Sequence, residues 1–264
     1  MLKLKKSLGQ NFLVDKNIIN KIISQLNLKN QIVLEIGAGS GNLTDAIIKE
    51  EIKKIFLIEK DNRFFSLLNK KYIKKDKIHI YNEDILNYDL KKINFNNVIV
   101  FGNLPYNIST QILVKFIILN TWPPFFKNLI FMFQKEVADR ILAKSKTKEY
   151  GRLSILTNFR LEIINSFPIS RNCFFPKPAV DSKIIVFKPR IKNIYNIQNI
   201  KNLEKITNTF FSSRRKIIKK PLSKIFKNYE DVAEQLKLNI NLRPSELNNS
   251  DYYKLTECLE KFKA

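Results

Sequence analysis

Short apolar runs alternate with amphipathic stretches along the first 190 residues of the chain. Runs with the length of buried strands lie at 31–36, 54–58, 78–81, 98–101, 129–133, 161–167 and 183–188. Helical spacing predicts helices at 16–26, about 42–50, 61–72, 108–120, 134–143 and 153–159. Asp15 precedes the first of these helices, where its carboxylate is placed to cap it. This alternation predicts an α/β fold with a doubly wound, mostly parallel sheet of about seven strands.

The pattern changes after Pro189. Residues 191–200 are rich in Asn and Ile without clear periodicity, which indicates a linker, and 201–264 has helical character with breaks expected near Pro221, near Asn228 and around 239–247. Five cations fall in the nine residues from 212 to 220. We therefore expect two domains, 1–190 with the sheet and 191–264 as a small, basic, all-helical domain.

The chain has only six glycines, and three of them, Gly37, Gly39 and Gly41, follow the strand expected at 31–36. Glycine is the residue that adopts left-handed backbone and allows close approach, so this clustering indicates a special backbone function. A strand, a glycine loop and a helix open a dinucleotide- or nucleoside-binding fold. The loop alone fits nicotinamide, flavin and methyltransferase enzymes. Glu35 stands on the strand where a nicotinamide fingerprint usually has its first glycine, and so favours a methyltransferase.

Two further expected strands end in carboxylates. Glu59 follows Gly39 by twenty residues, the spacing at which an acidic side chain accepts hydrogen bonds from ribose hydroxyls. Asp84 lies in the loop, 82–85, by which the next expected strand exits, and it is placed to accept from an adenine amine. Because the carboxyl ends of parallel strands share one edge of a sheet, the three strand ends predict a nucleoside pocket.

The sequence Gly102-Asn103-Leu104-Pro105-Tyr106-Asn107 follows the apolar run at 98–101. Asn103 supplies a carbonyl acceptor beside an amide donor, Pro105 stiffens the turn, and Tyr106 offers a flat face for stacking. Such a turn suits a planar substrate with an exocyclic amine, and an ordinary structural loop remains the alternative. A second loop, 174–182, has two prolines, and Phe174 or Phe175 is a candidate to stack on a base, with a structural hairpin connection as the alternative.

The net charge is +23, with 47 Lys+Arg against 24 Asp+Glu among 264 residues. Such a surface attracts polyanions, nucleic acid first. The abundance of Lys, Asn and Ile also resembles the composition of an A/T-rich genome, which offers a second origin for part of the Lys excess. No apolar run reaches the ~20 residues of a membrane helix, no secretory signal is recognised, and two cysteines and one histidine give no metal spacing. We expect a cytoplasmic protein without a metal, with His79 in a structural role.

Several motifs together resemble the ribosomal RNA adenine dimethyltransferases. They are Ser7–Leu13, Glu35–Thr44, Glu59, Glu83–Asp84, Gly102–Asn107, Gln134–Ala138, Tyr150–Ser154 and Phe174–Ser182. The run Phe210–Lys216 is similar to the helical tail of the small-subunit (16S) members. The resemblance covers nearly the whole chain in order, and it implies a Rossmann-like class I methyltransferase domain and a role in small-subunit biogenesis.

The resemblance implies S-adenosylmethionine as methyl donor, S-adenosylhomocysteine as product, and 16S rRNA within the 30S subunit as partner. It implies dimethylation at N6 of two adjacent adenines in the hairpin loop near the 3′ end of that RNA. With the residues above, it gives one expected mechanism. The expected cofactor-binding residues are Asn11, Leu13, Gly37, Glu59, Asp84 and Asn103. The expected catalytic residues are Asn103, Leu104, Pro105, Tyr106 and Phe174.

In this mechanism the Asn103 side-chain oxygen and the Leu104 carbonyl accept the two N–H bonds of the target amine, and Tyr106 and Phe174 sandwich its ring. Asn11 and Leu13 close the N-terminal segment over the cofactor. We expect a monomer. Two other functions stay open: a non-catalytic RNA-binding assembly factor, and an adenine methyltransferase of 23S rRNA. The Asn103–Tyr106 turn disfavours the first and the 16S-like tail the second.

Overall fold

The computed structural model describes residues 10–192 and 194–262, so the expectations for Ser7, Leu8 and Gly9 lie outside the described residues. The chain divides into two compact units. The first unit comprises residues up to 115, 123–138 and 163–189, and the second comprises 116–122, 139–162 and 190 onward. The units are therefore not divided at a single position near residue 190, because the chain passes into the second unit three times.

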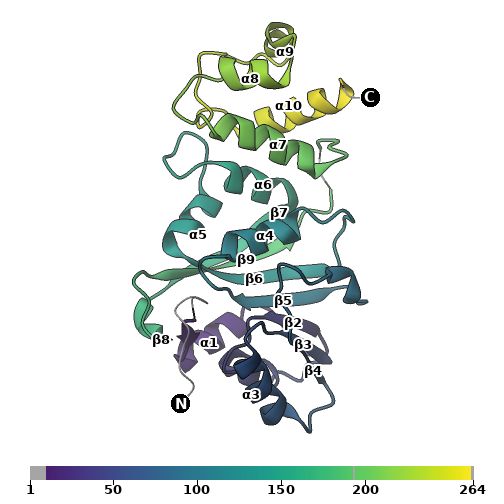
Figure 1. The fold of residues 1–264 in the computed structure, drawn as a ribbon, viewed down its shortest axis with the longest axis vertical. Helices are drawn as coiled ribbons and strands as arrows, with labels where there is room; N and C mark the ends of the chain where they lie inside the picture. The colour runs from purple at the N-terminus through teal and green to yellow at the C-terminus, as the bar shows by residue number, and fades with distance from the viewer. Residues whose placement is uncertain (1–9, 193, 263–264) are drawn as a thin grey trace. The chain divides into compact units, whose positions relative to one another are not determined.

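Within the described residues, seven strands form one sheet in the order β4-β3-β2-β5-β6-β9-β7 (Figure 1). They are β2 (Ile32–Ile36), β3 (Lys54–Ile58), β4 (Ile78–Tyr81), β5 (Val98–Asn103), β6 (Phe126–Gln134), β7 (Leu161–Ile169) and β9 (Ser182–Pro189). The five strands β4 to β6 pair in parallel and β9 pairs antiparallel with β6. The mostly parallel Rossmann-like sheet is thus confirmed, with the bounds of β3 and β4 as predicted.

The strand order reverses at β2, which has β3 on one side and β5 on the other. Its last residue, Ile36, lies in register with Gly102 of β5 and with Ile58 of β3. In open α/β sheets, ligands bind outside the carboxyl ends of the strands at such a switch point. The glycine loop after β2 and the Asn103 turn after β5 therefore meet at the place where the fold favours a ligand.

Three helices of the first unit pack on one face of this sheet. They are α1 (Lys16–Ile23), α2 (Asn42–Ile47) and α3 (Asn62–Tyr72). Buried Ile22, Ile47 and Leu68 from these helices share one hydrophobic cluster with Val33 of β2 and Leu57 of β3. Asp15 caps α1 as predicted, because its carboxylate accepts from the amides of Asn17 and Ile18.

Two short strands that the sequence pattern did not reveal join the N-terminal segment to the 174–182 loop. β1 (Phe12–Leu13) pairs antiparallel with β8 (Phe174–Phe175), in a sheet of their own. Two residues are too few for a periodicity to show. α4 (Ser109–Ile117) and α5 (Lys135–Leu142) follow β5 and β6, and each crosses from the first unit into the second.

The remaining α-helices of the described residues belong to the second unit. They are α6 (Arg152–Arg160), α7 (Ile200–Phe211), α8 (Lys219–Ile225), α9 (Tyr229–Gln235) and α10 (Asn249–Lys261). The Tyr253 hydroxyl of α10 donates to the Ile155 carbonyl of α6 at 3.1 Å. The break expected near Pro221 is present but lies just before this residue. Pro221 lies in the first turn of α8, where the missing N–H costs little. The helices break before it, between Phe211 and Lys219.

Candidate active site

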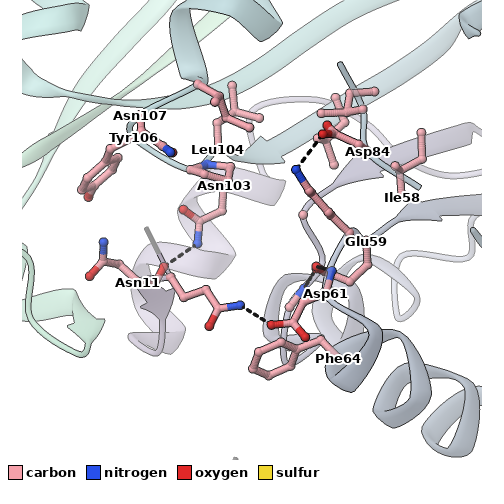
Figure 2. Close-up of a pocket in the computed structure, with 18 of the residues that line it drawn as sticks. Asn11, Ile58, Glu59, Asp61, Phe64, Asp84, Asn103, Leu104, Tyr106 and Asn107 are labelled. Carbon is pink, nitrogen blue, oxygen red and sulfur yellow. Dashed lines mark hydrogen bonds and ion pairs between the residues drawn. The ribbon is translucent and has the colours of Figure 1, made fainter. Parts of the chain in front are cut away.

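A cavity of about 200 Å³ opens at the carboxyl ends of β2, β3, β4 and β5, within the first unit (Figure 2). Its lining includes nearly all the residues expected there from the sequence: Asn11, Gly37, Glu59, Asp84, Asn103, Leu104, Pro105 and Tyr106. Residues separated by almost a hundred positions in the chain thus surround one space. The structure therefore has a cavity at the place where the strand ends predict a nucleoside pocket.

The charge of this cavity is opposite to that of the chain. Glu59, Asp61, Glu83 and Asp84 line it, against Lys60 as a cation, although the chain carries a net charge of +23. Partly enclosed carboxylates stabilise a positively charged ligand, because water screens their field less than at an open surface. The site therefore suits a cationic ligand rather than a phosphate-rich one.

The glycine loop has backbone that only glycine adopts readily. Gly37, Gly39 and Gly41 have φ values of +71°, +53° and +79°. A Cβ on Gly39 would lie 2.4 Å from the Phe12 ring, and one on Gly41 would lie 2.6 Å from the Tyr72 hydroxyl oxygen. The glycine cluster is thus explained by conformation and by close packing, as the sequence predicted.

Glu59 sits at the end of β3 and is only 7% exposed. Its two carboxylate oxygens accept the backbone N–H groups of Gly39 at 2.9 Å and Asp61 at 2.8 Å. Burial raises the pKa of the Glu59 carboxyl, and these hydrogen bonds oppose the rise. A carboxylate offers about four lone-pair positions. Glu59 can therefore fix the glycine loop and still accept from a ligand.

Asp84 lies in the loop after β4, and hydrogen bonds from Lys60 and from Lys115 hold this loop. Its carboxylate accepts from Lys60 Nζ at 2.7 Å and from the Leu86 N–H at 3.0 Å. Burial alone would raise the pKa of Asp84, but these hydrogen bonds outweigh it and lower the pKa. Lys115 of α4 donates to the carbonyls of Leu86 and Tyr88 at 2.8 and 2.7 Å. Lys115 thereby holds the loop that presents Asp84.

Asn103 is the last residue of β5, so the sheet itself positions it. Its side-chain Nδ2 donates to the backbone carbonyl of Asn11 at 3.1 Å (Figure 2). Because the amide is planar, this bond also sets the direction of Oδ1, which accepts but cannot donate. A Cβ on Gly102 would lie 2.4 Å from the Leu104 side chain, which explains the glycine before Asn103.

Tyr106 follows on the same turn and is held by its hydroxyl group. That hydroxyl hydrogen-bonds the Ser182 side chain of β9, with 2.6 Å between the oxygens. Ser182 is 1% exposed, so one end of the ring is anchored to a buried strand. The ring belongs to the cavity lining, beside the Asn103 side chain.

Two expected site residues do not line this cavity. Leu13 is 4% exposed in the hydrophobic core and lines a smaller neighbouring cavity of about 30 Å³, together with Glu35. Phe174 is also 4% exposed, pairs with Leu13 across β1–β8, and lines neither cavity. Successive strand residues face opposite sides, and the exposed ring is Phe175, at 52%. Phe174 is therefore buried in this structure, and its stacking on the target base stays a prediction.

Glu35 is the buried carboxyl of the smaller cavity. It is 2% exposed, accepts the Thr44 hydroxyl at 2.7 Å, and burial raises its pKa to about 7. A cationic group nearby would favour its ionised form and lower that pKa.

Among the described residues, no group of three or more His, Cys, Asp or Glu side chains is placed to hold a metal ion.

Sequence reasoning missed several residues that support the site. Asp61 follows Glu59 by two and reads only as a helix cap, yet its carboxylate binds Gln10 at 2.8 Å. Lys115 reads as the polar face of a helix, and Ser182 as a loop end. None of these carries a sequence signal for its partner, because the pairings cross 51, 29 and 76 residues of chain.

Residues 1–261 match the family described as ribosomal RNA adenine dimethylase. The chain belongs to this family. A relative from Pelagibacter ubique, named ribosomal RNA small subunit methyltransferase A, is 45% identical over 259 residues, 97% of each chain. A Prochlorococcus marinus relative with the same name is 38% identical over 269 residues, covering 98% of this chain and 97% of its own.

Solved structures agree with this family assignment. A dimethyladenosine transferase from Plasmodium falciparum superposes with a TM-score of 0.73 at 26% identity, over 96% of this chain and 98% of that one. The 23S rRNA methyltransferase ErmE has a TM-score of 0.68 at 22% identity, over 94% and 99%. The second likeness concerns the fold alone. The dimethyladenosine transferase thus matches nearly the whole length of this chain.

Proposed function

We propose that this chain is a 16S rRNA adenine dimethyltransferase, which uses S-adenosylmethionine to methylate N6 of two adjacent adenines in the 3′-terminal hairpin loop. One observation carries the proposal. The amide of Asn103 is fixed at the end of β5, at the edge of a cavity lined with carboxylates. Family membership and the names of the relatives support the choice of substrate.

The cavity fits the methyl donor chemically. S-adenosylmethionine carries a sulfonium, an ammonium and a carboxylate, so its net charge is positive. The cavity is lined by four carboxylates against one lysine, and two of them are paired, Asp84 with Lys60 and Asp61 with Arg63. Asp84 would accept from the adenine amine, Glu59 from the ribose hydroxyls, and Gly37 allows close approach to the methionine part. Asn11 completes the cover at the N-terminal side. When bound, the cofactor supplies a methyl group that is already activated for transfer, so no strong general base is required.

Asn103 and Leu104 would prepare the nucleophile. An adenine amine is a weak nucleophile because its lone pair is delocalised into the ring. Acceptance of its two N–H bonds by Asn103 Oδ1 and the Leu104 carbonyl would localise that lone pair and direct it toward the methyl group. Pro105 stiffens the turn that carries both acceptors. Tyr106 would stack on the flipped base.

A 4% exposed Phe174 cannot stack on a base without local rearrangement. As long as Phe174 stays in the core, Tyr106 provides one face of the sandwich, and Phe175, at 52% exposure, is the ring of that loop accessible to RNA. The mechanism therefore depends chiefly on the Asn103–Tyr106 turn.

The second unit supplies the basic surface for RNA. Arg214 donates to the backbone carbonyls of Lys148 and Thr147, so it braces a neighbouring loop, whereas Arg215 and Lys216 are exposed. Such cations position a protein on phosphates without reading sequence.

We propose that residues 191–264 bind rRNA of the 30S subunit. We also propose that the enzyme acts as a monomer and works in the cytoplasm, where ribosomes are assembled. In the described residues no helix is long and apolar enough to span a membrane.

Replacing Asp84 by alanine is expected to weaken S-adenosylmethionine binding by about ten- to a hundredfold. Loss of one charge-assisted hydrogen bond costs roughly 1.5–3 kcal/mol. Calorimetry measures the affinity, and Asp76→Ala, an exposed carboxylate before β4, is the matched control. RNA binding should be unchanged in both variants. An unchanged cofactor affinity in Asp84→Ala would remove Asp84 from the cofactor site.

Changing Arg215 and Lys216 together to glutamine is expected to flatten the salt dependence of RNA binding. Each phosphate contact contributes roughly 0.7 to 0.9 to the slope of log K against log salt, so the slope should fall by about one and a half units. The control is Lys49→Gln with Lys53→Gln, two exposed cations of the first unit. Equal slopes in both double variants would mean that Arg215 and Lys216 form an ordinary solvated face.

Transfer of labelled methyl groups to isolated ribosomal subunits tests the substrate. We expect label from S-adenosylmethionine to enter RNA of unmethylated small subunits and not RNA of large subunits. Label in the large subunit would favour the 23S alternative. Binding to small subunits without any label would favour the non-catalytic assembly factor.

A further inference from the structure

We propose that Gln10 is a positioning residue for methyl transfer, which orients the amide of Asn103 through the N-terminal segment. This inference rests on the proposed function, because it assigns Gln10 a role in the same transfer step. The segment in question is residues 10–13, and its anchor is Asp61 at the start of α3. A residue that only covered the cofactor would change cofactor affinity, whereas a positioning residue changes the rate.

The segment is fixed on both sides of Asn11. Gln10 Nε2 donates to Asp61 Oδ2 at 2.8 Å. The Phe12 ring packs on Phe64 of α3, with ring centroids 5.0 Å apart. Two residues beyond Asn11, the Leu13 carbonyl accepts from Asn42 Nδ2 at 2.8 Å. These contacts leave little freedom for the backbone of Asn11 between them.

Asn11, in the middle of the segment, contacts the Asn103–Tyr106 turn. The Asn11 carbonyl accepts from Asn103 Nδ2 at 3.1 Å. A planar amide held at its nitrogen has its oxygen held as well, so the Asn11 carbonyl sets the direction in which Asn103 Oδ1 points. A shift of the segment would release Nδ2, and the amide could then rotate or turn over, offering N–H where an acceptor is needed.

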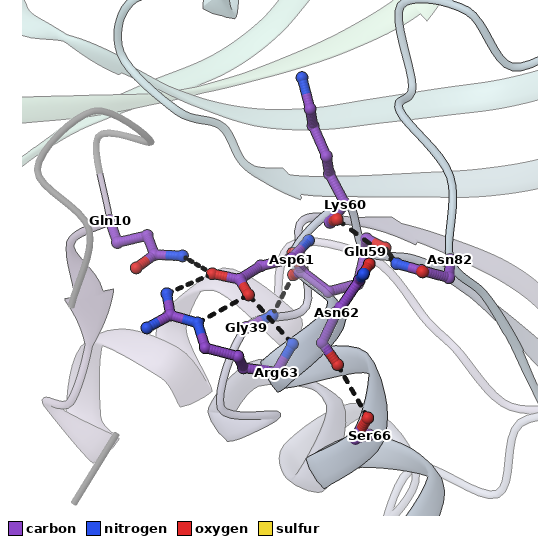
Figure 3. Close-up of polar contacts among 9 residues, drawn as sticks. All are labelled: Gln10, Gly39, Glu59, Lys60, Asp61, Asn62, Arg63, Ser66 and Asn82. Atoms are coloured by element: carbon purple, nitrogen blue, oxygen red, sulfur yellow. Dashed lines mark hydrogen bonds and ion pairs between the residues drawn. The ribbon is translucent and has the colours of Figure 1, made fainter. Parts of the chain in front are cut away.

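Asp61 is well suited as an anchor (Figure 3). It is 6% exposed and accepts from Arg63 Nε at 2.9 Å, from Arg63 Nη2 at 2.5 Å and from the Arg63 N–H at 3.0 Å. These bonds, above all those from the Arg63 side chain, hold the pKa of Asp61 well below its usual value, so the anchor stays ionised. Its own N–H donates to Glu59 Oε1 at 2.8 Å. One end of the segment is thus tied to the same rigid helix start that holds Glu59.

These contacts predict that Gln10 affects the rate of methyl transfer. Acceptors aimed at the amine matter most in the transition state, where its lone pair must point at the methyl group. Small displacements of such groups are costly, since about 1 Å can reduce the rate a hundredfold. Loss of the Gln10 contact should therefore lower the rate at saturating cofactor, and it should do so only while Asn103 is present to be misaligned.

A double-mutant cycle under single-turnover conditions tests this. The variants are Gln10→Ala, Asn103→Ala and the pair, assayed on small subunits at saturating S-adenosylmethionine, with the melting temperature measured for each. Val14→Ala, an exposed side chain beside β1, is the control and should match the unmodified enzyme. Gln10 is changed rather than Asp61, because Asp61 also caps α3.

We expect Gln10→Ala to lower the rate by about tenfold in the unmodified background and by less than about twofold in Asn103→Ala. Such a difference would show strong energetic coupling between Gln10 and Asn103. Gln10→Glu, which faces Asp61 with a like charge, should have at least the effect of Gln10→Ala. Equal effects in both backgrounds, or an effect that saturating cofactor abolishes, would overturn the inference and leave the proposed function intact. An unmodified enzyme without methyl transfer would overturn both.

Discussion

Asn103→Ala is expected to lower the single-turnover rate of adenine methylation by about a hundred- to a thousandfold, the size of effect seen when one preorganised transition-state contact is removed. The physical reason is that Asn103 Oδ1 accepts from an amine that becomes more acidic as the N–C bond forms. RNA binding should change little, because phosphate contacts dominate it. The rate is measured on unmethylated small subunits at saturating cofactor, beside a binding titration.

Asn94→Ala is the matched control for Asn103, since it removes an exposed amide that does not line the cavity. It should transfer methyl groups at the unmodified rate. Equal losses of rate and RNA affinity in Asn103→Ala would indicate that Asn103 contributes ground-state binding instead. An unmodified rate in Asn103→Ala would contradict the amine-orienting role altogether.

Tyr106→Ala is expected to slow methyl transfer by about ten- to a hundredfold, because stacking of a flipped base on an aromatic ring is worth about 1–3 kcal/mol. Tyr106→Phe keeps the ring and loses only the hydrogen bond to Ser182 Oγ, so it should lose a few-fold at most. Ser182→Ala removes the same hydrogen bond from its other side. Tyr106→Phe and Ser182→Ala should therefore resemble each other and differ from Tyr106→Ala.

The same assay distinguishes the ring from the hydroxyl group. If Tyr106→Phe is as slow as Tyr106→Ala, the hydroxyl carries the effect and the stacking role is wrong. If Ser182→Ala is far slower than Tyr106→Phe, Ser182 contributes something besides the anchor of this ring. Melting temperatures of the three variants separate both cases from unfolding, since Ser182 is buried in β9.

Much of the first unit could be predicted because its signals are local. Apolar runs bounded by glycine or acidic residues gave β2, β3, β4 and β5, and the order of their ends gave the cavity. The Gly37–Gly41 cluster is visible in a chain with six glycines, because left-handed backbone leaves a mark on composition. Asn103 and Glu59 could be predicted because a recognisable strand marks their positions. Glu59 directly follows β3, and Asn103 is the last residue of β5.

The errors and omissions concern features that depend on tertiary contacts. A pattern of apolar and polar residues does not tell which ring of Phe174–Phe175 is buried, since that depends on pairing with Phe12–Leu13 far away in the chain. The Gln10–Asp61 and Tyr106–Ser182 contacts are also long-range. That Pro221 lies in the first turn of α8 and not in the break itself also depends on where this helix begins, which the sequence pattern does not show.

Nucleoside analysis of small-subunit RNA is the most direct test of the central claim, that this cavity dimethylates adenine at N6. Unmethylated small subunits are incubated with S-adenosylmethionine and either the unmodified enzyme or Asn103→Ala, and the RNA is then digested and analysed by mass spectrometry. We predict two N6,N6-dimethyladenosines per subunit, at adjacent positions near the 3′ end, with the unmodified enzyme, and a loss of nearly all of this product with Asn103→Ala. Methylation at another atom or base, no methylated nucleoside, or full dimethylation by Asn103→Ala would contradict the account.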